Sequence, residues 1–269
     1  MNLYDIRKEY ITQKYSAANA SSRTCQDVLL SKIAKSTLSK NVTIKGGVII
    51  SHLSKDKRRA TRDFDLDFIR YSLDDDSIRQ FIGKLDSVDD GITIEITDKI
   101  EELRHEEYQG KRVYLSLSDK YNNTIETKLD IGVHSRLNIE QDDYCFDLSS
   151  IGQNVYLLVN SIEQVFTEKL ASLLKFGRIS TRYKDIFDIY YFIDSGDINK
   201  EKINLCFNEY IFSAKDTRFH STTDISKRLI GIFSNKVFLS LADTAQSNWL
   251  EIPINEVTTK ILTFIKSFK

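Results

Sequence analysis

Three aspartates on alternate residues, Asp63, Asp65 and Asp67, are the feature of this chain that most clearly predicts chemistry. Side chains along a β-strand point alternately to its two faces, so a strand here would place the three carboxylates on one face. At about 4 Å, each like-charged pair costs on the order of 1 kcal/mol in water and ~4 kcal/mol at an effective dielectric of 20. A bound divalent cation would reverse the sign of that energy. The alternative is an exposed edge strand whose charges prevent aggregation.

A glycine pair, Gly46-Gly47, lies between the β-branched run 42–45 and the apolar run 48–50. This pattern predicts a strand, a tight turn and the start of a helix. Backbone amides at such a turn can approach and bind a phosphate, because glycine has no Cβ. A glycine pair alone is more often a plain turn. Together with the aspartates downstream, it predicts a site in which the turn holds phosphate and the carboxylates hold metal.

A further carboxylate, Asp130, lies in segment 125–133, whose odd-numbered residues are apolar or β-branched. The alternation places Asp130 on the opposite face, together with Glu126, Lys128 and Gly132. An aspartate late in a core strand suits a third metal ligand or a general base. A solvent-facing strand aspartate is the alternative.

These motifs resemble the core signature of the nucleotidyltransferase superfamily, and more closely that of the AbiEii/AbiGii-type nucleotidyltransferase toxins. Besides Asp130, the motifs that carry the resemblance are Gly46-Gly47, Arg59-x-Thr61-x-Asp63-Phe64-Asp65-Leu66, Glu168-Lys169-Leu170 and Arg182-Tyr183-Lys184-Asp185-Ile186-Phe187-Asp188. They occur in the family's order between residues ~42 and ~194. One departure is Val48, where family members usually carry Ser or Thr, so that a hydroxyl contact to phosphate is missing and Ser51 is the nearest substitute.

Two predicted helices, near 161–176 and 182–194, carry charged residues on their apolar faces. At 100° per residue, Lys169 falls inside the apolar stripe of the first helix. A lysine there either extends along its methylenes to solvent or holds an anion. Arg182 and Asp185 fall on or beside the stripe of the second helix, and an ion pair between them is the alternative to a ligand-binding role.

The resemblance implies a role for each matching residue. The implied catalytic residues are Asp63, Asp65, Asp130, Lys169 and Asp185. The implied nucleotide-binding residues are Gly46, Gly47, Arg59, Thr61, Lys169 and Arg182. The implied metal is Mg²⁺, with Mn²⁺ as the alternative, and its ligands would be Asp63, Asp65 and Asp130. The role of Asp67 stays open.

The activity implied by the resemblance is transfer of a nucleoside monophosphate from a nucleoside triphosphate to an acceptor, with release of pyrophosphate. An RNA 3′ end, such as that of tRNA, is the implied acceptor. The protein would be the toxin of a bacterial toxin–antitoxin pair, acting in phage defence by abortive infection, with its antitoxin encoded adjacently. Two alternatives remain: a protein or small-molecule hydroxyl as acceptor, or a non-catalytic nucleotide- or RNA-binding module. The complete set of aspartates speaks against the second.

Composition limits the partners of this 269-residue chain. Its 38 basic and 39 acidic residues give a formal net charge of −1, so only a local patch could attract nucleic acid. Candidate patches are the loop 55–62 and the set Lys175, Arg178, Arg182 and Lys184. Cys25, Cys145 and Cys206 lack metal-ligand spacing, and we expect buried, reduced thiols in a cytoplasmic protein. With no long apolar run and no signal peptide, we expect no membrane association.

A change of hydrophobic period predicts the architecture. From 42 to 160 the pattern is mostly strand-like, including 92–96, 113–117 and 155–158, with one helix near 75–85. After Ser161 it is helical, with helices near 161–176, 182–194, 199–211, 224–240 and 254–268. We therefore expect an α+β fold, with a mixed-sheet domain over 1–160 followed by an all-helical domain over 161–269. The resemblance implies that the first domain is nucleotidyltransferase-like and that the second completes the nucleotide site.

Overall fold

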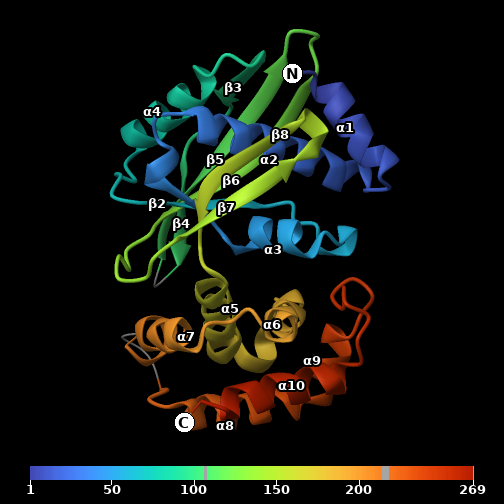
Figure 1. The fold of residues 1–269 in the computed structure, drawn as a ribbon, viewed down its shortest axis with the longest axis vertical. Coiled ribbons are helices and arrows are strands. Elements are labelled where there is room, and N and C mark those ends of the chain that lie inside the picture. The colour runs from blue at the N-terminus through green and yellow to red at the C-terminus, as the bar shows by residue number, and fades with distance from the viewer. Residues whose placement is uncertain (106–107, 214–217, 269) are drawn as a thin grey trace. The chain divides into compact units, whose positions relative to one another are not determined.

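The computed structural model describes residues 1–105, 108–213 and 218–268. The chain divides into two compact units, Met1–Asn160 and Ser161–Lys269 (Figure 1). The first unit combines helices with a sheet, and the described part of the second is helical. The α+β fold class predicted from the sequence is confirmed.

An eight-stranded mixed sheet forms the centre of the first unit. Its strands are β1 (Val42–Ile44), β2 (Phe64–Phe68), β3 (Ile92–Ile96), β4 (Glu101–His105), β5 (Tyr108–Asp119), β6 (Thr124–Val133), β7 (Asp142–Leu148) and β8 (Gln153–Val159). Their order is β3-β5-β6-β2-β1-β8-β7, with β4 paired to β5. The pairs β1–β8 and β2–β6 are parallel, and the other pairs are antiparallel.

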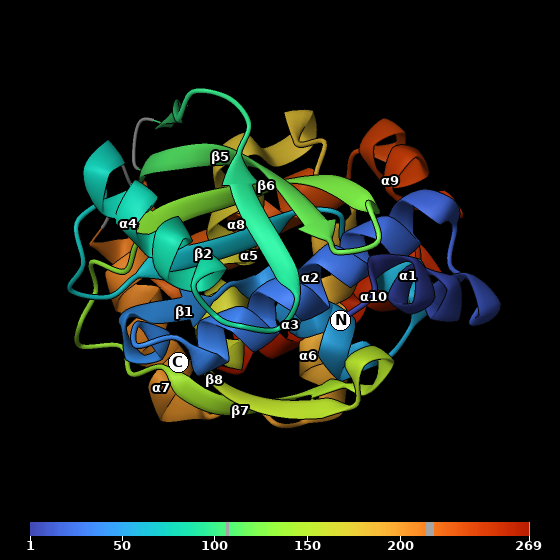
Figure 2. The same ribbon diagram turned by 90° about the horizontal axis from the view of Figure 1, so that it is seen from above.

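The predicted alternation along β2 and β6 is present. Phe64, Leu66 and Phe68 of β2 are buried, as are Leu129 and Ile131 of β6. Helix α2 (Ala17–Lys35) packs against β6 and β8 and contributes to covering this apolar side (Figure 2). The charged residues of the two strands lie on the opposite face.

Other helices complete the first unit: α1 (Leu3–Thr12), α3 (Gly46–Ser54) and α4 (Asp75–Asp86). The sequence predicts α4 nearly to its bounds, and the side chain of Asp74 caps it by accepting from the Ser77 N–H at 2.7 Å. The sequence patterns give no sign of α2, because polar side chains such as Asp27 and Lys32 are fully buried along it. A helix buried on several sides has no simple apolar stripe.

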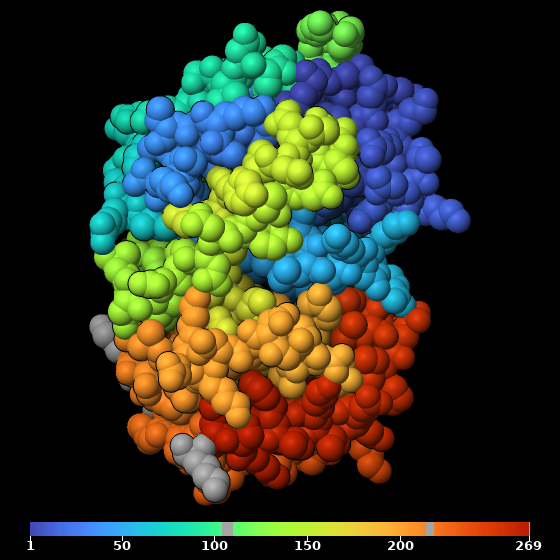
Figure 3. Space-filling model, viewed as in Figure 1, coloured from blue at the N-terminus to red at the C-terminus, as the bar shows by residue number. Residues whose placement is uncertain are grey.

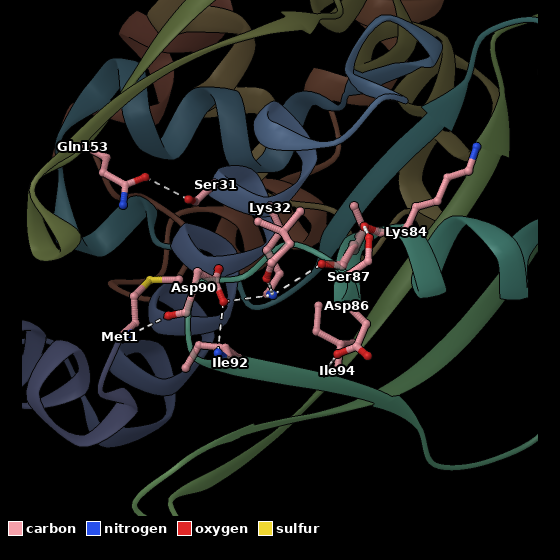
Figure 4. Close-up of polar contacts among 12 residues, drawn as sticks. Met1, Ser31, Lys32, Lys84, Asp86, Ser87, Asp90, Ile92, Ile94 and Gln153 are labelled. Carbon is pink, nitrogen blue, oxygen red and sulfur yellow. Dashed lines mark hydrogen bonds and ion pairs between the residues drawn. The ribbon is translucent and has the colours of Figure 1, made fainter.

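The buried side chain of Lys32 joins α2 to the turn between α4 and β3 through polar contacts (Figure 4). Its ammonium group lies 2.9 Å from a carboxylate oxygen of Asp90 and donates to the backbone carbonyls of Val88 at 3.0 Å and Leu85 at 3.3 Å. The same Asp90 oxygen accepts from the Ile92 N–H at 3.0 Å, at the start of β3. One buried cation thus holds the end of a helix and the start of a strand.

We expect Lys32→Met to lower the free energy of unfolding by about 3 kcal/mol, because the Asp90 carboxylate, with 6% of its side chain exposed, would lose its buried cation. Urea unfolding measures the change. Lys84→Met, which removes an exposed lysine of α4, is the matched control and should change stability by no more than about 0.5 kcal/mol. Equal midpoints for the two variants would contradict the assigned role.

The helices of the second unit are α5 (Ile162–Phe176), α6 (Lys184–Ser195), α7 (Lys200–Phe207), α8 (Thr222–Phe233), α9 (Lys236–Ala242) and α10 (Ile254–Lys266). The prediction of one helix over 224–240 is wrong. Two helices occupy this region, because the Asn235 side chain accepts from the Phe238 N–H at 2.8 Å and starts a new helix. The predicted helix over 199–211 ends as α7 at Phe207 and continues as a π-helical turn, Asn208–Phe212.

The expectation of buried thiols holds for Cys25 and Cys206 and is wrong for Cys145, which is exposed. Cys145 lies on the outer face of β7, whose next inward residue, Phe146, is fully buried. Figure 3 shows the β7–β8 hairpin at the surface, in yellow-green. Within the described residues, no helix has the length and apolarity required to span a bilayer.

Candidate active site

The register of the sheet brings together residues that are far apart in the sequence. Asp65 of β2 lies directly opposite Asp130 of the parallel strand β6. Arg112 of β5 lies opposite Asp130 on the other side. Lys45 follows β1, and its N–H donates to the Asp65 carbonyl at 3.1 Å. Four charged residues therefore form a row across neighbouring strands, on the face opposite the apolar core.

Three carboxylates near Asp65 form ion pairs with basic side chains. The pairs are Lys45 Nζ with Asp67 Oδ2 at 3.0 Å, Lys128 Nζ with Asp63 Oδ1 at 2.8 Å, and the Arg112 guanidinium with both oxygens of Asp130 at 2.7 Å. Asp67, whose role the sequence leaves open, is thus a buried partner of Lys45. The arginine pair is bidentate, the strongest of these arrangements.

Asp65 is the carboxylate whose charge is least favourable here. Burial, followed by the negative charges of Asp130 and Asp63, raises its pKa to about 6, and Lys45 only partly offsets this. A raised carboxyl pKa means that the folded chain disfavours the charged form. The predicted repulsion among the aspartates is therefore present and centred on Asp65.

The donor set fits a divalent cation in its chemistry. Asp63, Asp65 and Asp130 offer carboxylate oxygens, the ligands that Mg²⁺ prefers, and a cation would offset the repulsion at Asp65. As the side chains lie, no three His, Cys, Asp or Glu residues in the described part of the chain are arranged to hold a metal ion. Lys128 holds Asp63 and Arg112 holds Asp130. Metal binding would require these two carboxylates to exchange a basic partner for the metal.

The glycine pair begins helix α3, as the sequence predicts. Gly46 and Gly47 are its first two residues. Their N–H groups therefore lie in the first turn, where backbone N–H groups have no intrahelical acceptor. A Cβ on Gly47 would lie 3.3 Å from the hydroxyl oxygen of Thr61. The Thr61 hydroxyl thus lies against the start of α3, where a phosphate would be bound.

Thr61 lies outside strand β2 and does not share a strand face with Asp65 and Asp67. Strand β2 begins at Phe64, so Thr61 and Asp63 precede it. Gln26 of α2 orders this segment, because its amide donates to the carbonyls of Thr61 at 3.1 Å and Asp63 at 3.4 Å. The sequence does not single out Gln26, since a helical glutamine forms no motif. Arg59 lies in the preceding 3₁₀ turn and is buried.

We expect Thr61→Glu to lower nucleotide transfer at least about tenfold, because it adds negative charge beside Gly47 and the carboxylates. Phosphorylation of Thr61 would silence the protein for the same reason. Thr61→Val, which keeps the shape and removes the hydroxyl, is the control for packing and should unfold at nearly the same urea concentration. Transfer rates of both variants are measured side by side, and an active Thr61→Glu protein would rule the switch out.

In the second unit, Lys169 of α5 contacts two carboxylates of α6. Its ammonium group pairs with Asp185 and lies 2.9 Å from an oxygen of Asp188. Asp188 is fully buried, and its other oxygen accepts from the Trp249 indole N–H at 3.1 Å. Of the two alternatives for Lys169, holding an anion is therefore the one observed, and the anions are protein carboxylates.

Arg182 lies outside this cluster. It is exposed and precedes α6, which begins at Lys184 rather than at 182. Within the described residues, Asp185 pairs with Lys169 and not with Arg182. Sequence reasoning did not assign a role to Asp188 or Trp249. The spacing of Asp185 and Asp188, three residues apart on one helix face, is the signal that could have identified Asp188.

Comparison with known families finds a match over most of the chain. A family described as "Nucleotidyl transferase AbiEii toxin, Type IV TA system" matches residues 27–252. A search of curated proteins found no match. Among solved structures, an antigenic nucleotidyltransferase-like protein from Paracoccidioides brasiliensis is similar at 19% identity, covering 82% of this chain and 91% of that chain, with a TM-score of 0.46.

Proposed function

Since the chain belongs to the AbiEii nucleotidyl transferase toxin family of type IV toxin–antitoxin systems, we propose that it transfers a nucleoside monophosphate from a nucleoside triphosphate to RNA in a Mg²⁺-dependent reaction. The observation that supports this most is the charged row across β1, β2, β6 and β5. It centres on Asp65, whose pKa is raised by burial and by neighbouring carboxylates. A fold rarely keeps such repulsion for stability, whereas a cation-dependent site requires it.

The proposed ligands of the metal are Asp63, Asp65 and Asp130. A bound Mg²⁺, or Mn²⁺ in its place, would offset the negative charge of the triphosphate. It would also stabilise the negative charge that develops on the phosphate oxygens during transfer. The backbone N–H groups of Gly46 and Gly47 would donate to phosphate oxygens at the start of α3.

Basic and acidic side chains supply the rest of the proposed chemistry. Asp130 would accept the proton of the attacking hydroxyl, which requires it to leave Arg112. Lys169 and Arg182 would supply positive charge for the nucleotide's phosphates. Asp185, which pairs with Lys169, would orient the lysine before the nucleotide binds and would then release its ammonium group to the phosphates.

The proposed acceptor is an RNA 3′ end, such as that of tRNA, and its modification would be the toxic event in abortive infection. The partner would be an antitoxin encoded next to this protein. These points follow from the family resemblance, and the proposed role of Asp130 as the base would place the acceptor hydroxyl near Asp130.

Purified protein, α-³²P-labelled nucleoside triphosphates, Mg²⁺ and total RNA test the proposal. We expect the label to move to RNA, to depend on the metal and to be absent with Asp65→Asn. Label on protein would indicate the alternative acceptor class. Label that stays on the triphosphate with every acceptor would contradict transfer.

A further inference from the structure

A second concentration of positive charge lies within the helical unit, away from Lys169. A pocket of about 310 Å³ is lined by Arg178, Lys227, Arg228, Gly231 and Ile232. Three of the five lining residues are basic, and all three are exposed. None of the residues assigned above to catalysis or nucleotide binding lines it.

Two elements build the pocket. Arg178 lies in the 3₁₀ turn Gly177–Ile179, which follows α5 and packs against α8. Lys227 and Arg228 lie on α8, one turn before Gly231 and Ile232, so these four residues share one side of the helix. Helix α8 is labelled in Figure 1.

Arg228 is held in place by the backbone. Its Nε donates to the carbonyl of Leu174, in the last turn of α5, at 3.1 Å. Its guanidinium also lies against Gly177, which has a φ of +55° and where a Cβ would meet Nη2 at 2.4 Å. The fold thus fixes one edge of the guanidinium, and the remaining N–H groups can donate to a ligand.

Within the described residues, Arg178, Lys227 and Arg228 form no direct ion pair with a carboxylate. Asp224, one turn earlier on α8, is a carboxylate that interacts electrostatically with Lys227, and its pKa is lowered mainly by the His220 N–H and the Ser221 hydroxyl and to a smaller extent by Lys227. Three basic side chains around one small pocket are suited to a phosphate.

Gly231 lines the pocket and presents no side chain to it. Glycine inside a helix costs about 1 kcal/mol relative to alanine. A Cβ at Gly231 would meet no atom within 4 Å, so internal packing does not require glycine there. What the missing side chain provides is space beside the three basic residues.

The residues next to Arg178 suit a nucleic acid. Phe176 is 46% exposed and Ile179 is 82% exposed. The Lys175 ammonium lies 5.8 Å from the centre of the Phe176 ring. Exposed aromatic rings among basic side chains are the usual means of holding single-stranded nucleic acid, because bases stack on the rings while cations contact phosphates.

We propose that this pocket binds a backbone phosphate of the acceptor RNA, with Phe176 available to stack on a neighbouring base. The inference rests on the proposed function for the existence of an RNA acceptor. Arg178 lies just beyond the end of α5, and the seven residues from Lys169 to the last residue of the helix, Phe176, correspond to about 10 Å along its axis. The pocket is therefore a site for a part of the RNA at a distance from the Lys169 cluster. Such a local site is needed because the formal net charge is −1.

The test uses the full chain with Arg178 and Lys227 both changed to Gln, leaving Arg228 because of its bond to Leu174. The matched control changes Lys200 and Lys266 to Gln, two exposed lysines of the same unit that do not line the pocket. Binding of fluorescein-labelled tRNA is followed by anisotropy at several salt concentrations. We expect the pocket variant to bind about tenfold more weakly, with a salt slope lower by about one to two units, and the control to match wild type.

A second variant, Gly231→Glu, places a carboxylate in the pocket without removing a basic residue, and should weaken RNA binding while keeping the helix. Binding of nucleoside triphosphate should be unchanged in both variants. Unchanged RNA affinity and salt slope would overturn the proposal, as would weakened triphosphate binding with RNA binding intact. Because binding is measured without transfer, a wild-type protein that binds RNA but labels another acceptor would contradict the proposed function and leave the pocket assignment standing.

Discussion

Asp65→Asn is expected to abolish nucleotide transfer, by at least about 10³-fold, while leaving the fold intact. The change keeps the shape of the side chain and removes the carboxylate at the centre of the charged row. Loss of one charge-stabilising donor costs about 10²–10³ in rate, and loss of a ligand to a reacting metal should cost more. Single-turnover transfer with labelled triphosphate measures the effect.

The same substitution should make the protein more stable near neutral pH when no metal is bound. Burial and like charges raise the pKa of folded Asp65 to about 6 from an ordinary 3.8. A raised pKa contributes stability that is present below the ordinary value and is lost as pH rises through about 6. Asp65→Asn should therefore gain on the order of 1–3 kcal/mol at about pH 7.5, and this gain should vanish towards pH 4.

Asp67→Asn is the matched control on the same strand. Asp67 is buried and paired with Lys45 at 3.0 Å, so its neutralisation should lower stability at pH 7.5 instead of raising it. Mg²⁺ should raise the melting temperature of the wild type and not that of Asp65→Asn. Wild-type transfer by Asp65→Asn, or destabilisation equal to that of Asp67→Asn, would refute the metal assignment.

The sequence predicts which residues share a face but not which residues meet. Period-two alternation places Asp65 and Asp130 on the polar faces of their strands. Asp65 and Asp130 are about 65 positions apart in the sequence, and they lie opposite each other only because β2 pairs with β6 in parallel. The alternation disfavours a one-residue shift in register, which would move every side chain to the other face, but a two-residue shift would keep the faces and separate the two aspartates. The pairing of Lys128 with Asp63 depends on this register too.

Residues that act through the backbone or from a buried helix are the hardest to predict. Gln26 orders the segment before β2 through two carbonyls, and Lys32 holds α2 to the turn between α4 and β3. Both lie in α2, whose buried polar side chains conceal its helical period. A buried polar residue is recognisable only once its partners are known, since its stability depends on those partners.

Lys169 shows how partners change a prediction. On the sequence alone, Lys169→Met should fold well, because methionine suits the apolar stripe of α5. The structure places Asp185 and the fully buried Asp188 against Lys169. We therefore expect Lys169→Met to lower the free energy of unfolding by about 3–5 kcal/mol, since it leaves a buried carboxylate without its cation. Transfer should fall by roughly 10²–10³, the range for one lost charge-stabilising donor.

The double change Lys169→Met with Asp188→Asn separates folding from catalysis. Asp188→Asn removes the buried charge and keeps an oxygen that can accept from the Trp249 indole at the observed distance of 3.1 Å. The double variant should therefore recover most of the lost stability in urea unfolding while staying as inactive as Lys169→Met. Asp188→Asn alone leaves Lys169 paired with Asp185 and serves as the control for the second change. If the double variant regains both stability and full turnover, Lys169 is a structural residue that only neutralises Asp185 and Asp188, and another group must supply the positive charge for transfer.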